Sequence, residues 1–299
     1  MEGGIDRTIA GMTMELAAMT KRVALVTGAG RGVGQAIARA LCQHGWAVAV
    51  TDVDIRAAVS SAASIETDHE PGWGETLALA LDVRMADSWA FALSETRARF
   101  GRVSALVNNA GISPRGGVED TSLALWEHVL AVNLTGAFLG IQAAWPDLVQ
   151  TRGSIVNIGS TRGSRPMRNL VAYGVSKAGL EALTRQVAIE GLKVGVTCNC
   201  LAAGWMDTPG ERLIQASLGR PDFPAGLVNL IPLDHLGQTV AFLLAPHARH
   251  LNGVTLHLDS GLHIADHADL IFQPESRAPT SSAFQSTSNP SSPNPPESN

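Results

Sequence analysis

Charged residues are scarce in this chain: Asp, Glu, Lys and Arg make up 16% of its 299 residues, and the formal net charge is −5. The sequence contains no run of basic residues, so it gives no reason to expect a nucleic-acid partner. Cysteine is rarer still. Cys42, Cys198 and Cys200 are an odd number of thiols, and no disulfide framework is implied. Hydrophobic residues make up 45% of the chain, which is ample material for a buried core.

Long hydrophobic runs are missing as well. No apolar run approaches the roughly 20 residues that a membrane-spanning helix needs, so we expect no membrane partner. Residues 1–20 include Glu2, Asp6 and Glu15 and lack the basic-then-apolar order of a signal peptide. We therefore expect residues 1–20 to be a flexible extension ahead of the fold, and the protein to be cytoplasmic.

A complete set of metal ligands is not apparent either. Five histidines lie between His247 and His267, and His263 and His267 have the i, i+4 spacing of one helical face. No glutamate or cysteine is placed to complete a site with them. We expect these histidines to be scattered over the surface and an edge strand, with no metal bound.

The two ends of the chain differ in composition from its middle. Residues 279–299 contain 17 Ser, Thr, Pro or Asn among 21 positions, and such a segment cannot bury enough apolar surface to offset the entropy of ordering it. We expect residues 265–299 to be a disordered tail. Between them and the N-terminal extension, predicted strands alternate with predicted helices without a break, which favours one α/β domain over residues 21–264.

A glycine-rich turn follows the first predicted strand. Val23 to Val26 is a short apolar run typical of a parallel strand buried on both faces, and apolar residues at helical spacing begin at Ile37. The turn between them reads Thr27-Gly-Ala-Gly-Arg-Gly-Val-Gly34. In a strand–turn–helix context, such glycines let the backbone approach a dinucleotide pyrophosphate, whose charge is met by the helix N-terminus.

The choice between NAD and NADP depends on Asp52, which follows a second predicted strand at residues 47–51. An acidic side chain there accepts hydrogen bonds from the ribose hydroxyls of adenosine and repels a 2′-phosphate. Arg31, in the glycine-rich turn, is a basic residue that would suit a 2′-phosphate instead. Because Asp52 lies at the ribose itself, we expect NAD as the cofactor and NADP as the less favoured alternative.

The second motif is Tyr173-Gly-Val-Ser-Lys177, with Ser160 thirteen residues upstream. Positions i and i+4 share one face of a helix, so the Lys177 ammonium can lie beside the Tyr173 ring. A nearby cation favours the phenolate and lowers a pKa that is ordinarily about 10. Tyr173 is therefore predicted to carry a proton near neutral pH.

With these two motifs, the chain resembles the compact branch of the short-chain dehydrogenase/reductase family over about residues 21–264. Residues 27–34 match its TGxxxGxG turn, Asp82-Val83 matches the pair that contacts adenine, and Asn108-Asn-Ala-Gly111 matches the NNAG segment beside the cofactor. The resemblance implies a single Rossmann-like fold, a doubly wound parallel sheet of about seven strands with helices on both faces. It also implies an NAD-dependent oxidoreductase that interconverts a secondary alcohol and a ketone by hydride transfer.

The resemblance assigns catalysis to four residues, Asn133, Ser160, Tyr173 and Lys177. Tyr173 would exchange the proton of the alcohol, and Ser160 would hold the substrate oxygen. Lys177 would lower the pKa of Tyr173 and grip the nicotinamide ribose. Asn133 would interrupt the bonding of an apolar helix and hold a water that links Lys177 to solvent. The cofactor-binding residues that it implies are Gly28, Arg31, Gly32, Val33, Gly34, Asp52, Asp82, Val83, Asn109, Ala110, Gly111, Tyr173, Lys177 and Gly204.

Three features depart from the family pattern, and none touches the four catalytic residues. The Pro-Gly that follows the sixth strand is Ala203-Gly204 here, and Asp259-Ser-Gly261 replaces Asp-Gly-Gly near the last strand. Residues 232–237 run almost directly into residues 239–243, so a turn and part of a helix look deleted. The resemblance further implies a homodimer or homotetramer, built through the helices that contain Asn133 and Tyr173.

The substrate is expected to lie under the loop at residues 204–237. Residues 161–168, just after Ser160, supply three arginines, which we interpret as a solvated loop in preference to a site for an anionic substrate. We expect a small polyol, sugar or cyclic alcohol as substrate. One alternative is a 3-oxoacyl-(acyl-carrier-protein) reductase-like carbonyl reductase, which is weakened because residues 134–150 lack the Lys and Arg that an acidic carrier needs. A non-catalytic NAD-binding protein is the further alternative.

Overall fold

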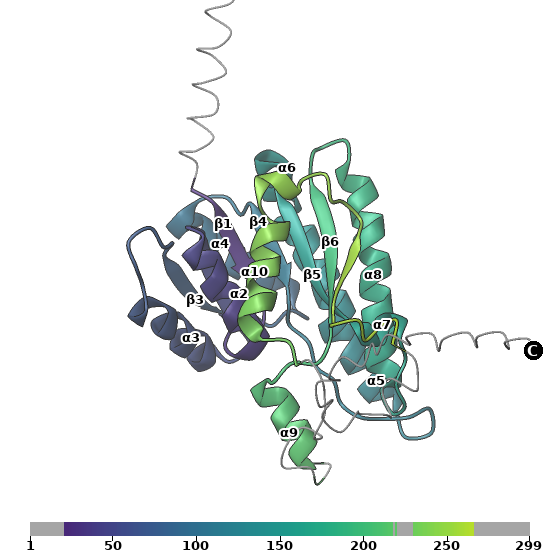
Figure 1. Ribbon diagram of the computed structural model, residues 1–299. Coiled ribbons are helices and arrows are strands. Elements are labelled where there is room, and N and C mark those ends of the chain that lie inside the picture. Colours follow the sequence, from purple (N-terminus) through teal and green to yellow (C-terminus); the bar gives the residue numbers. More distant parts are fainter. Residues whose placement is uncertain (1–20, 218, 220–229, 266–299) are drawn as a thin grey trace, which may run out of the picture. The chain divides into compact units, whose positions relative to one another are not determined.

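The structure is a computed structural model, shown as a ribbon in Figure 1, and it describes residues 21–217, 219 and 230–265. The chain divides into two units after Ile264, and the fold described here belongs to the first. The described residues form a seven-stranded parallel sheet in the order β3-β2-β1-β4-β5-β6-β7. The predicted α/β class, with a doubly wound parallel sheet of about seven strands, is therefore confirmed.

The strands are short and lie next to one another in a topology that reverses direction at its centre. Their bounds are β1 Val23–Val26, β2 Ala47–Asp52, β3 Thr76–Ala80, β4 Ala105–Asn108, β5 Ser154–Ser160, β6 Thr197–Ala203 and β7 Thr255–Leu258. The chain runs outward from β1 to β3, then returns to the other side of β1 with β4. In open parallel sheets, the carboxyl ends of the strands at such a reversal form a ligand-binding crevice.

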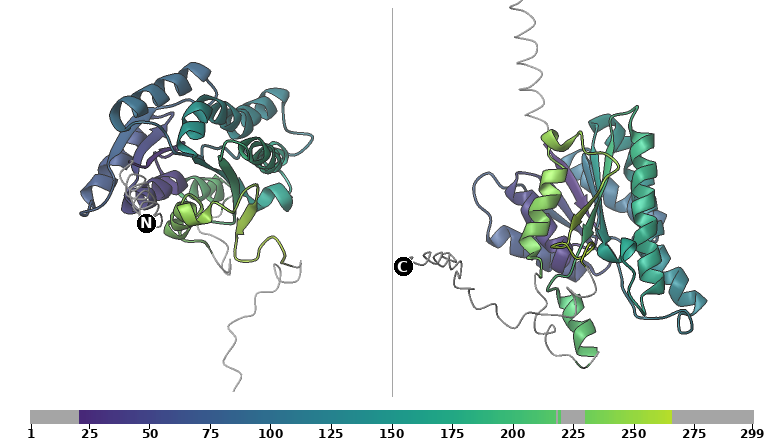
Figure 2. Two further views of the ribbon diagram at one scale, coloured as in Figure 1. Left: turned by 90° about the horizontal axis from the view of Figure 1, so that it is seen from above. Right: turned by 45° about the vertical axis from the view of Figure 1, so that its right-hand side comes forward.

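Helices connect the strands. Their bounds are α2 Gly32–Gln43, α3 Ile55–Thr67, α4 Ala86–Phe100, α5 Leu123–Leu130, the π-helix η1 Ala131–Thr135, α6 Gly136–Thr151, α7 Thr161–Ser164, α8 Val171–Gly191, α9 Pro209–Ser217, α10 Leu233–Leu243 and the 3-10 helix η2 Pro246–Ala248. They lie on both sides of the sheet, as the two views of Figure 2 show.

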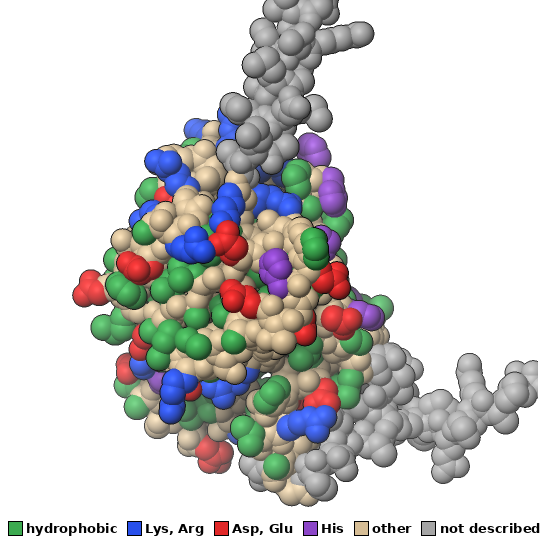
Figure 3. Space-filling view, turned by 90° about the vertical axis from the view of Figure 1, so that its left-hand side faces the viewer, with side chains coloured by type: hydrophobic (Ala, Val, Ile, Leu, Met, Phe, Trp, Pro, Cys, Tyr) green, Lys and Arg blue, Asp and Glu red, His purple; other side chains and the backbone are tan. Residues whose placement is uncertain are grey.

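Burial on both faces explains why the strands read as continuous apolar runs in the sequence. Alternate residues of β1 point to opposite sides of the sheet. Ala24 and Val26 belong to an apolar cluster with residues of α2, α3 and α10. Val23 and Leu25 belong to a second cluster, with residues of α4, α6 and α8. On the outer face drawn in Figure 3, basic and acidic side chains are interspersed between apolar ones.

Two of the departures from the family pattern have a clear local structure. The segment in which part of a helix looked deleted forms an unbroken helix, α10, from Leu233 to Leu243. It packs closely on α2, because a Cβ at Gly237 would lie 2.7 Å from the Ala36 carbonyl oxygen. At the second departure, Ser260 has a positive φ of 53°, a left-handed backbone that glycine adopts at no steric cost.

One helical run in the described residues, Leu123–Thr151, is long and apolar enough to cross a membrane by length and composition alone. The sequence analysis found no such run, because polar residues interrupt the apolar ones within it. The run is continuous because α5, η1 and α6 follow one another without a break. Ile141, Ala144 and Leu148 on this run are buried in the core, which is the position that an apolar helix takes in an α/β domain.

We predict that Gly140→Ala destabilises the fold, because a Cβ at Gly140 in α6 would overlap the fully buried indole ring of Trp89 in α4. Such overpacking costs about 1–3 kcal/mol, and it outweighs the gain of about 1 kcal/mol from replacing a helical glycine by alanine. Urea unfolding of the variant measures the loss.

The matched test is the same substitution in a Trp89→Phe background, where the smaller ring leaves room for the methyl group. The penalty of Gly140→Ala should shrink or change sign there. An equal penalty in both backgrounds would show that the indole contact is not its cause.

Candidate active site

A cavity of about 920 Å³ opens at the carboxyl ends of the central strands. Its walls include the glycine-rich turn, the ends of β2, β4, β5 and β6, and residues of α8 and α9. The structure brings all but one of the predicted site residues to this cavity: Gly28, Arg31, Gly32, Val33, Gly34, Asp52, Asp82, Val83, Asn109, Ala110, Gly111, Ser160, Tyr173, Lys177 and Gly204. The exception is Asn133, which lies behind the cavity wall.

The glycine-rich turn needs its glycines for two reasons. Gly28 and Gly32 have positive φ values of 60° and 56°, which side chains rarely adopt. A Cβ at Gly34 would overlap the Gly28 carbonyl oxygen. The turn leads into α2, whose first-turn N–H groups lack partners within the helix. Backbone donors at a helix N-terminus form a cradle suited to a phosphate group.

Thr27 and Asn109 hold the glycine-rich turn against β4. The Thr27 hydroxyl accepts hydrogen bonds from the backbone N–H groups of Asn109 and Ala110, at 3.0 and 2.9 Å. In return, the Asn109 amide donates to the carbonyls of Thr27 and Gly28, at 2.8 and 3.0 Å. Sequence reasoning quoted Thr27 within the motif but gave it no role, although a hydroxyl directly before the glycines was the available signal.

Asp52 ends β2 beside the glycine-rich turn. Its carboxylate accepts hydrogen bonds from the backbone N–H groups of Gly30 and Asp54, both at 3.0 Å, and its side chain faces the cavity. A Cβ at Gly30 would lie 2.8 Å from Asp52 Oδ2, so the turn and the carboxylate are in close contact. Arg31 also lines the cavity, as the one basic side chain of the turn.

Asp82 is held by a neighbouring arginine. Arg84 forms a two-pronged ion pair with its carboxylate, with Nε 2.9 Å from Oδ1 and Nη2 2.6 Å from Oδ2. These bonds lower the pKa of Asp82 below its ordinary value. Val83 packs next to it, against Gly136. The structure places both residues on the cavity wall, where the resemblance implied a contact with adenine.

Asn133 lies in the π-helix η1, at the break in helical bonding that the sequence predicts there. Its side-chain oxygen accepts from the Ile112 backbone N–H at 2.8 Å, and its amide donates to the Ile112 carbonyl at 2.9 Å. The amide also donates to Ser176 Oγ at 3.0 Å. Asn133 Oδ1 and Lys177 Nζ both approach Gly111, within 3.4 and 3.5 Å of the position that a Cβ would take there. π-helical turns are frequent at functional sites.

Ser160, Tyr173 and Lys177 meet at the end of β5. The Ser160 hydroxyl lies close enough to the Tyr173 phenol to lower its pKa. Lys177 Nζ donates to the Ile158 carbonyl at 2.7 Å and lies 5.8 Å from the centre of the Tyr173 ring. The lysine is 5% exposed, and its burial lowers the pKa to about 8. The three side chains therefore share one buried pocket.

The pKa of Tyr173 differs from the sequence-based expectation. Burial raises it above its ordinary value of about 10. The hydrogen bond from Ser160 and the charge of Arg162 act in the opposite direction. The Lys177 ammonium donates to the Ile158 carbonyl, and its predicted effect on the pKa of Tyr173 stays a prediction.

Two arginines in the cavity wall were not predicted as site residues. Arg162 lies above the Trp205 ring, with Cζ 5.6 Å from the ring centre. Arg115 Nε is buried and has no hydrogen-bond partner among the residues that the structure describes. Arg115 comes from the loop after β4, which the sequence analysis left unassigned. Arg162 belongs to the segment interpreted as a solvated loop. Arg162 lines the cavity, so its side chain is available to a bound substrate as well as to solvent.

The fold and this cavity define a nicotinamide-dependent oxidoreductase with a Rossmann-like sheet. The positive-φ glycines, the turn held on β4 and the Asp52 carboxylate together fit a dinucleotide, which supplies a hydride acceptor or donor when bound. The family model described as Enoyl-(Acyl carrier protein) reductase matches residues 28–263. The chain belongs to the short-chain dehydrogenase/reductase family, and it interconverts alcohols and ketones.

Relatives with assigned activities cover nearly the whole folded unit. The trans-4-hydroxycyclohexanecarboxylate dehydrogenase of Sinomonas cyclohexanicum is 32% identical over 245 residues, which are 81% of this chain and 93% of the relative. The 2,5-dichloro-2,5-cyclohexadiene-1,4-diol dehydrogenase of Sphingobium indicum is 34% identical over 247 residues, 80% of this chain and 95% of the relative. Both act on cyclic alcohols, as their names state.

Solved structures support the same fold and a nicotinamide cofactor. A variant of actinorhodin polyketide ketoreductase with NADPH has a TM-score of 0.74 at 26% identity, covering 82% of this chain and 98% of its own. The 3-ketoacyl-(acyl-carrier-protein) reductase of Brucella melitensis with NADH has a TM-score of 0.72 at 28% identity, covering 81% and 98%. The ketoreductase structure contains NADPH and the Brucella structure contains NADH, so the two do not decide between the cofactors.

We predict that Tyr173 of the chain alone ionises above its ordinary pKa of about 10. Tyr173 is the only tyrosine in the sequence, so the ultraviolet absorbance of phenolate reports this residue alone, and Tyr173→Phe supplies the blank. Because the fold favours the neutral phenol, stability should fall as the pH rises from about 10 through the raised pKa. A phenolate signal near neutral pH without cofactor would contradict this account of burial.

Proposed function

We propose that this chain oxidises a cyclic secondary alcohol that carries an anionic group, such as a carboxylate, with NAD as the hydride acceptor. The observation that supports the anionic group is the pair of arginines beside Tyr173. Neither Arg115 nor Arg162 forms an ion pair within the part of the chain that the structure describes. A cationic side chain that is partly buried without a counter-ion is an unfavourable arrangement that a bound anion relieves.

The local charge balance favours an anion. Arg165 and Arg115 lower the pKa of Arg162, in addition to its burial, while Glu211 acts in the opposite direction. Arg162 thus has two like-charged neighbours and one neighbour of opposite charge, the Glu211 carboxylate, which is itself hydrogen-bonded to Gln215 at 2.7 Å. Arginine binds carboxylates through two parallel hydrogen bonds, so this wall of the cavity suits a carboxylate better than a second hydroxyl group.

The proposed chemistry assigns separate tasks to the residues at the end of β5. As the phenolate, Tyr173 accepts the proton of the substrate hydroxyl, and Ser160 hydrogen-bonds the same oxygen and orients it. Arg162 lowers the pKa of the phenol and so opposes part of the effect of burial. Asn133 positions α8 through Ser176, whose hydroxyl donates to the Tyr173 carbonyl at 2.7 Å. Reversal of each step gives carbonyl reduction.

The relative from Sinomonas lends support to the substrate class, because its name gives a cyclic alcohol with a carboxylate. The Sphingobium relative acts on a cyclic diol whose name contains no acidic group, so the cyclic alcohol is the common part of the two names. The arginine pair is the reason to prefer the first type of substrate for this chain.

NAD is proposed over NADP on the position of Asp52. Its carboxylate is fixed by two backbone N–H groups and faces the cavity. A 2′-phosphate placed beside it would meet like charge in a partly desolvated site. Arg31 is exposed, so solvent screens its attraction for such a phosphate.

The second candidate is reduction of 3-oxoacyl groups on an acyl carrier protein, which the fold of the Brucella neighbour favours. An acidic carrier needs a basic docking face beside the cavity. Helix α6 carries no Lys or Arg, and we rank this function second for that reason.

A homo-oligomer is also part of our proposal. Phe138 on α6 and Val175 on α8 are apolar side chains that are each 46% exposed, and a second copy of the chain would cover them. Measuring the mass in solution tests the oligomeric state.

Asp52→Asn should shift the cofactor preference towards NADP. The amide keeps an acceptor for the backbone N–H groups but removes the charge, so kcat/KM with NADP should rise about tenfold or more, equivalent to about 1.4 kcal/mol. Asp54→Asn is the matched control, since Asp54 caps α3 through the Arg56 N–H and asparagine caps equally well. No change with NADP, or an equal change in the control, would remove Asp52 as the determinant.

Arg162→Gln should weaken binding of an anionic substrate selectively. With trans-4-hydroxycyclohexanecarboxylate, KM should rise about 10- to 100-fold, because the substrate loses a hydrogen bond to a charged group, worth about 1.5–3 kcal/mol. With cyclohexanol, which has no anionic group, KM should stay nearly unchanged. Arg168→Gln, at an exposed arginine of the same segment, is the control and should leave KM unchanged for both alcohols. Tyr173→Phe should abolish most turnover on both alcohols.

An equal rise in KM for the neutral and the anionic alcohol would show that Arg162 does not bind the anionic group. Wild-type preference for the neutral alcohol would overturn the anionic substrate class. Turnover that survives in Tyr173→Phe would contradict the proposed proton acceptor.

A further inference from the structure

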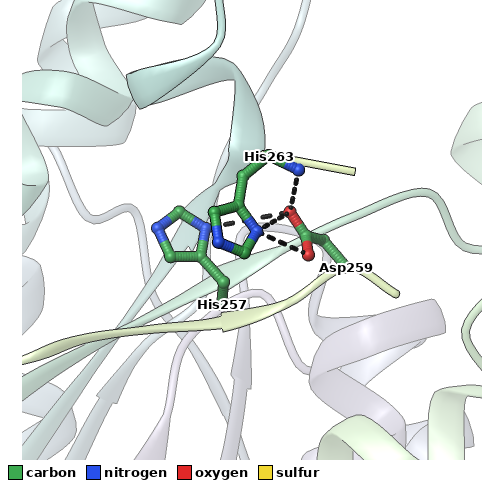
Figure 4. Close-up of side chains that lie close together, drawn as sticks. All are labelled: His257, Asp259 and His263. Atoms are coloured by element: carbon green, nitrogen blue, oxygen red, sulfur yellow. Dashed lines mark hydrogen bonds and ion pairs between the residues drawn. The ribbon is translucent and has the colours of Figure 1, made fainter. Parts of the chain in front are cut away.

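Two histidines and a carboxylate meet at the end of β7, outside the groups assigned to catalysis (Figure 4). His257 lies on β7, Asp259 directly follows the strand, and His263 lies four residues further on, with ligand atoms of all three within 4.8 Å of one another. His263 Nδ1 is 3.0 Å from both Asp259 oxygens, and His257 Nδ1 is 3.8 Å from Oδ2. The two imidazole rings stack, with centroids 4.0 Å apart and planes at 14°. The sequence analysis paired His263 with His267, which lies outside the described residues.

Two buried atoms at this cluster lack hydrogen-bond partners among the described residues. His257 Nδ1 is one, and Oε1 of Glu181, on the adjacent helix α8, is the other. The two side chains are close enough for His257 to affect the charge state of Glu181. A buried polar atom without a partner costs about 1–3 kcal/mol. The unpartnered His257 Nδ1 lies within the cluster, and a bound ion that accepts its lone pair would satisfy it.

The carboxylate of the cluster is fixed in place. Asp259 Oδ2 accepts hydrogen bonds from Thr161 Oγ1 at 3.1 Å and from the His263 backbone N–H at 2.8 Å. Oδ1 accepts from the Gly261 N–H at 3.1 Å. The side chain is 1% exposed. A fixed carboxylate next to an imidazole is the arrangement that surrounds metal-bound histidines, where it either binds the ion or orients the ring.

We propose that His257, Asp259 and His263 bind one divalent cation of borderline softness, with Zn²⁺ preferred over Mg²⁺ and Ca²⁺. Two imidazole nitrogens and one carboxylate oxygen are typical zinc ligands, whereas Mg²⁺ and Ca²⁺ favour oxygen. Bonds of about 2.0–2.2 Å place tetrahedral ligands roughly 3.3 Å apart. To reach the ion, the two rings turn out of their stack and the ligand atoms, which lie within 4.8 Å of one another, move closer together. Glu181 or a water molecule takes the fourth position.

The ion would stabilise the wall of the substrate cavity without touching the reacting atoms. Asp259 bonds Thr161, the residue after Ser160. It also packs on Gly204, where a Cβ would lie 2.7 Å from the Asp259 Cα. Leu262, in the turn between Asp259 and His263, lines the cavity. Binding of the cation therefore joins the end of β7 to two segments that border the active site.

The test is calorimetric titration of the full chain, purified without a histidine tag and treated with a chelator, with zinc chloride. One equivalent should bind and raise the unfolding temperature, whereas magnesium chloride should do neither. His257→Gln and His263→Gln should each weaken the affinity at least about tenfold, and His250→Gln, at an exposed histidine, should leave it unchanged. Cobalt should give the visible absorption of a tetrahedral site in the wild type and lose it in His257→Gln.

Absence of zinc binding to the folded wild type would overturn the proposal, as would unchanged affinity in the His257→Gln, His263→Gln double variant. The circular dichroism of each variant without metal separates loss of the site from loss of the fold. If both single variants unfold, Glu181→Gln offers the same test from a different helix, since weaker zinc binding supports the site. Unchanged affinity in Glu181→Gln together with no cobalt spectrum in the wild type would overturn it. These measurements do not depend on turnover, so they stand apart from the proposed substrate.

Discussion

The hydrogen bonds between the Asn133 amide and the Ile112 backbone are the constraint on which the active site depends. They hold the π-turn of the long helix against the loop that follows β4. The same amide reaches α8 through Ser176, whose hydroxyl donates to the Tyr173 carbonyl. One side chain thus fixes three segments that are distant in the sequence. Its loss would leave buried backbone groups of Ile112 unpaired, at about 1–3 kcal/mol each, and would release the first turn of the helix that carries the phenol.

Around the phenol, burial and charge act against each other. Burial raises the pKa of Tyr173 and lowers that of Lys177 to about 8, so the interior favours the neutral form of both. Arg162 opposes this at Tyr173. An anionic substrate bound at Arg162 would weaken the effect of the Arg162 charge on the pKa of Tyr173. The positive charge of an oxidised nicotinamide ring would lower that pKa again. The order in which charges enter the cavity therefore matters for the proton transfer.

Motifs contained in one strand–turn–helix unit could be predicted from the sequence, and contacts between distant segments could not. The glycines from Gly28 to Gly34 and the spacing of Ser160, Tyr173 and Lys177 are local, and the structure brings them to one cavity. The Ile158 carbonyl, which accepts a hydrogen bond from Lys177, lies on another element. Arg162, whose charge lowers the pKa of the phenol, lies on a third, so no local pattern predicted either contact. Arg115 had no local pattern at all. The sequence spacing paired His263 with His267, but the turn after β7 places His263 next to His257 and Asp259.

The long apolar helix Leu123–Thr151 has a consequence for the synthesis of the chain. It leaves the ribosome before β5, and its buried residues Ile141 and Ala144 belong to the same cluster as Ile155 of that strand. Until Ser154–Ser160 has been made and has paired with β4, that apolar face lacks its contacts with β5. A nascent chain that stops at this length exposes a helix which resembles a membrane segment. Chaperones and the membrane-insertion machinery would compete for it, and the interval before β5 emerges is the period in which this fold is most vulnerable.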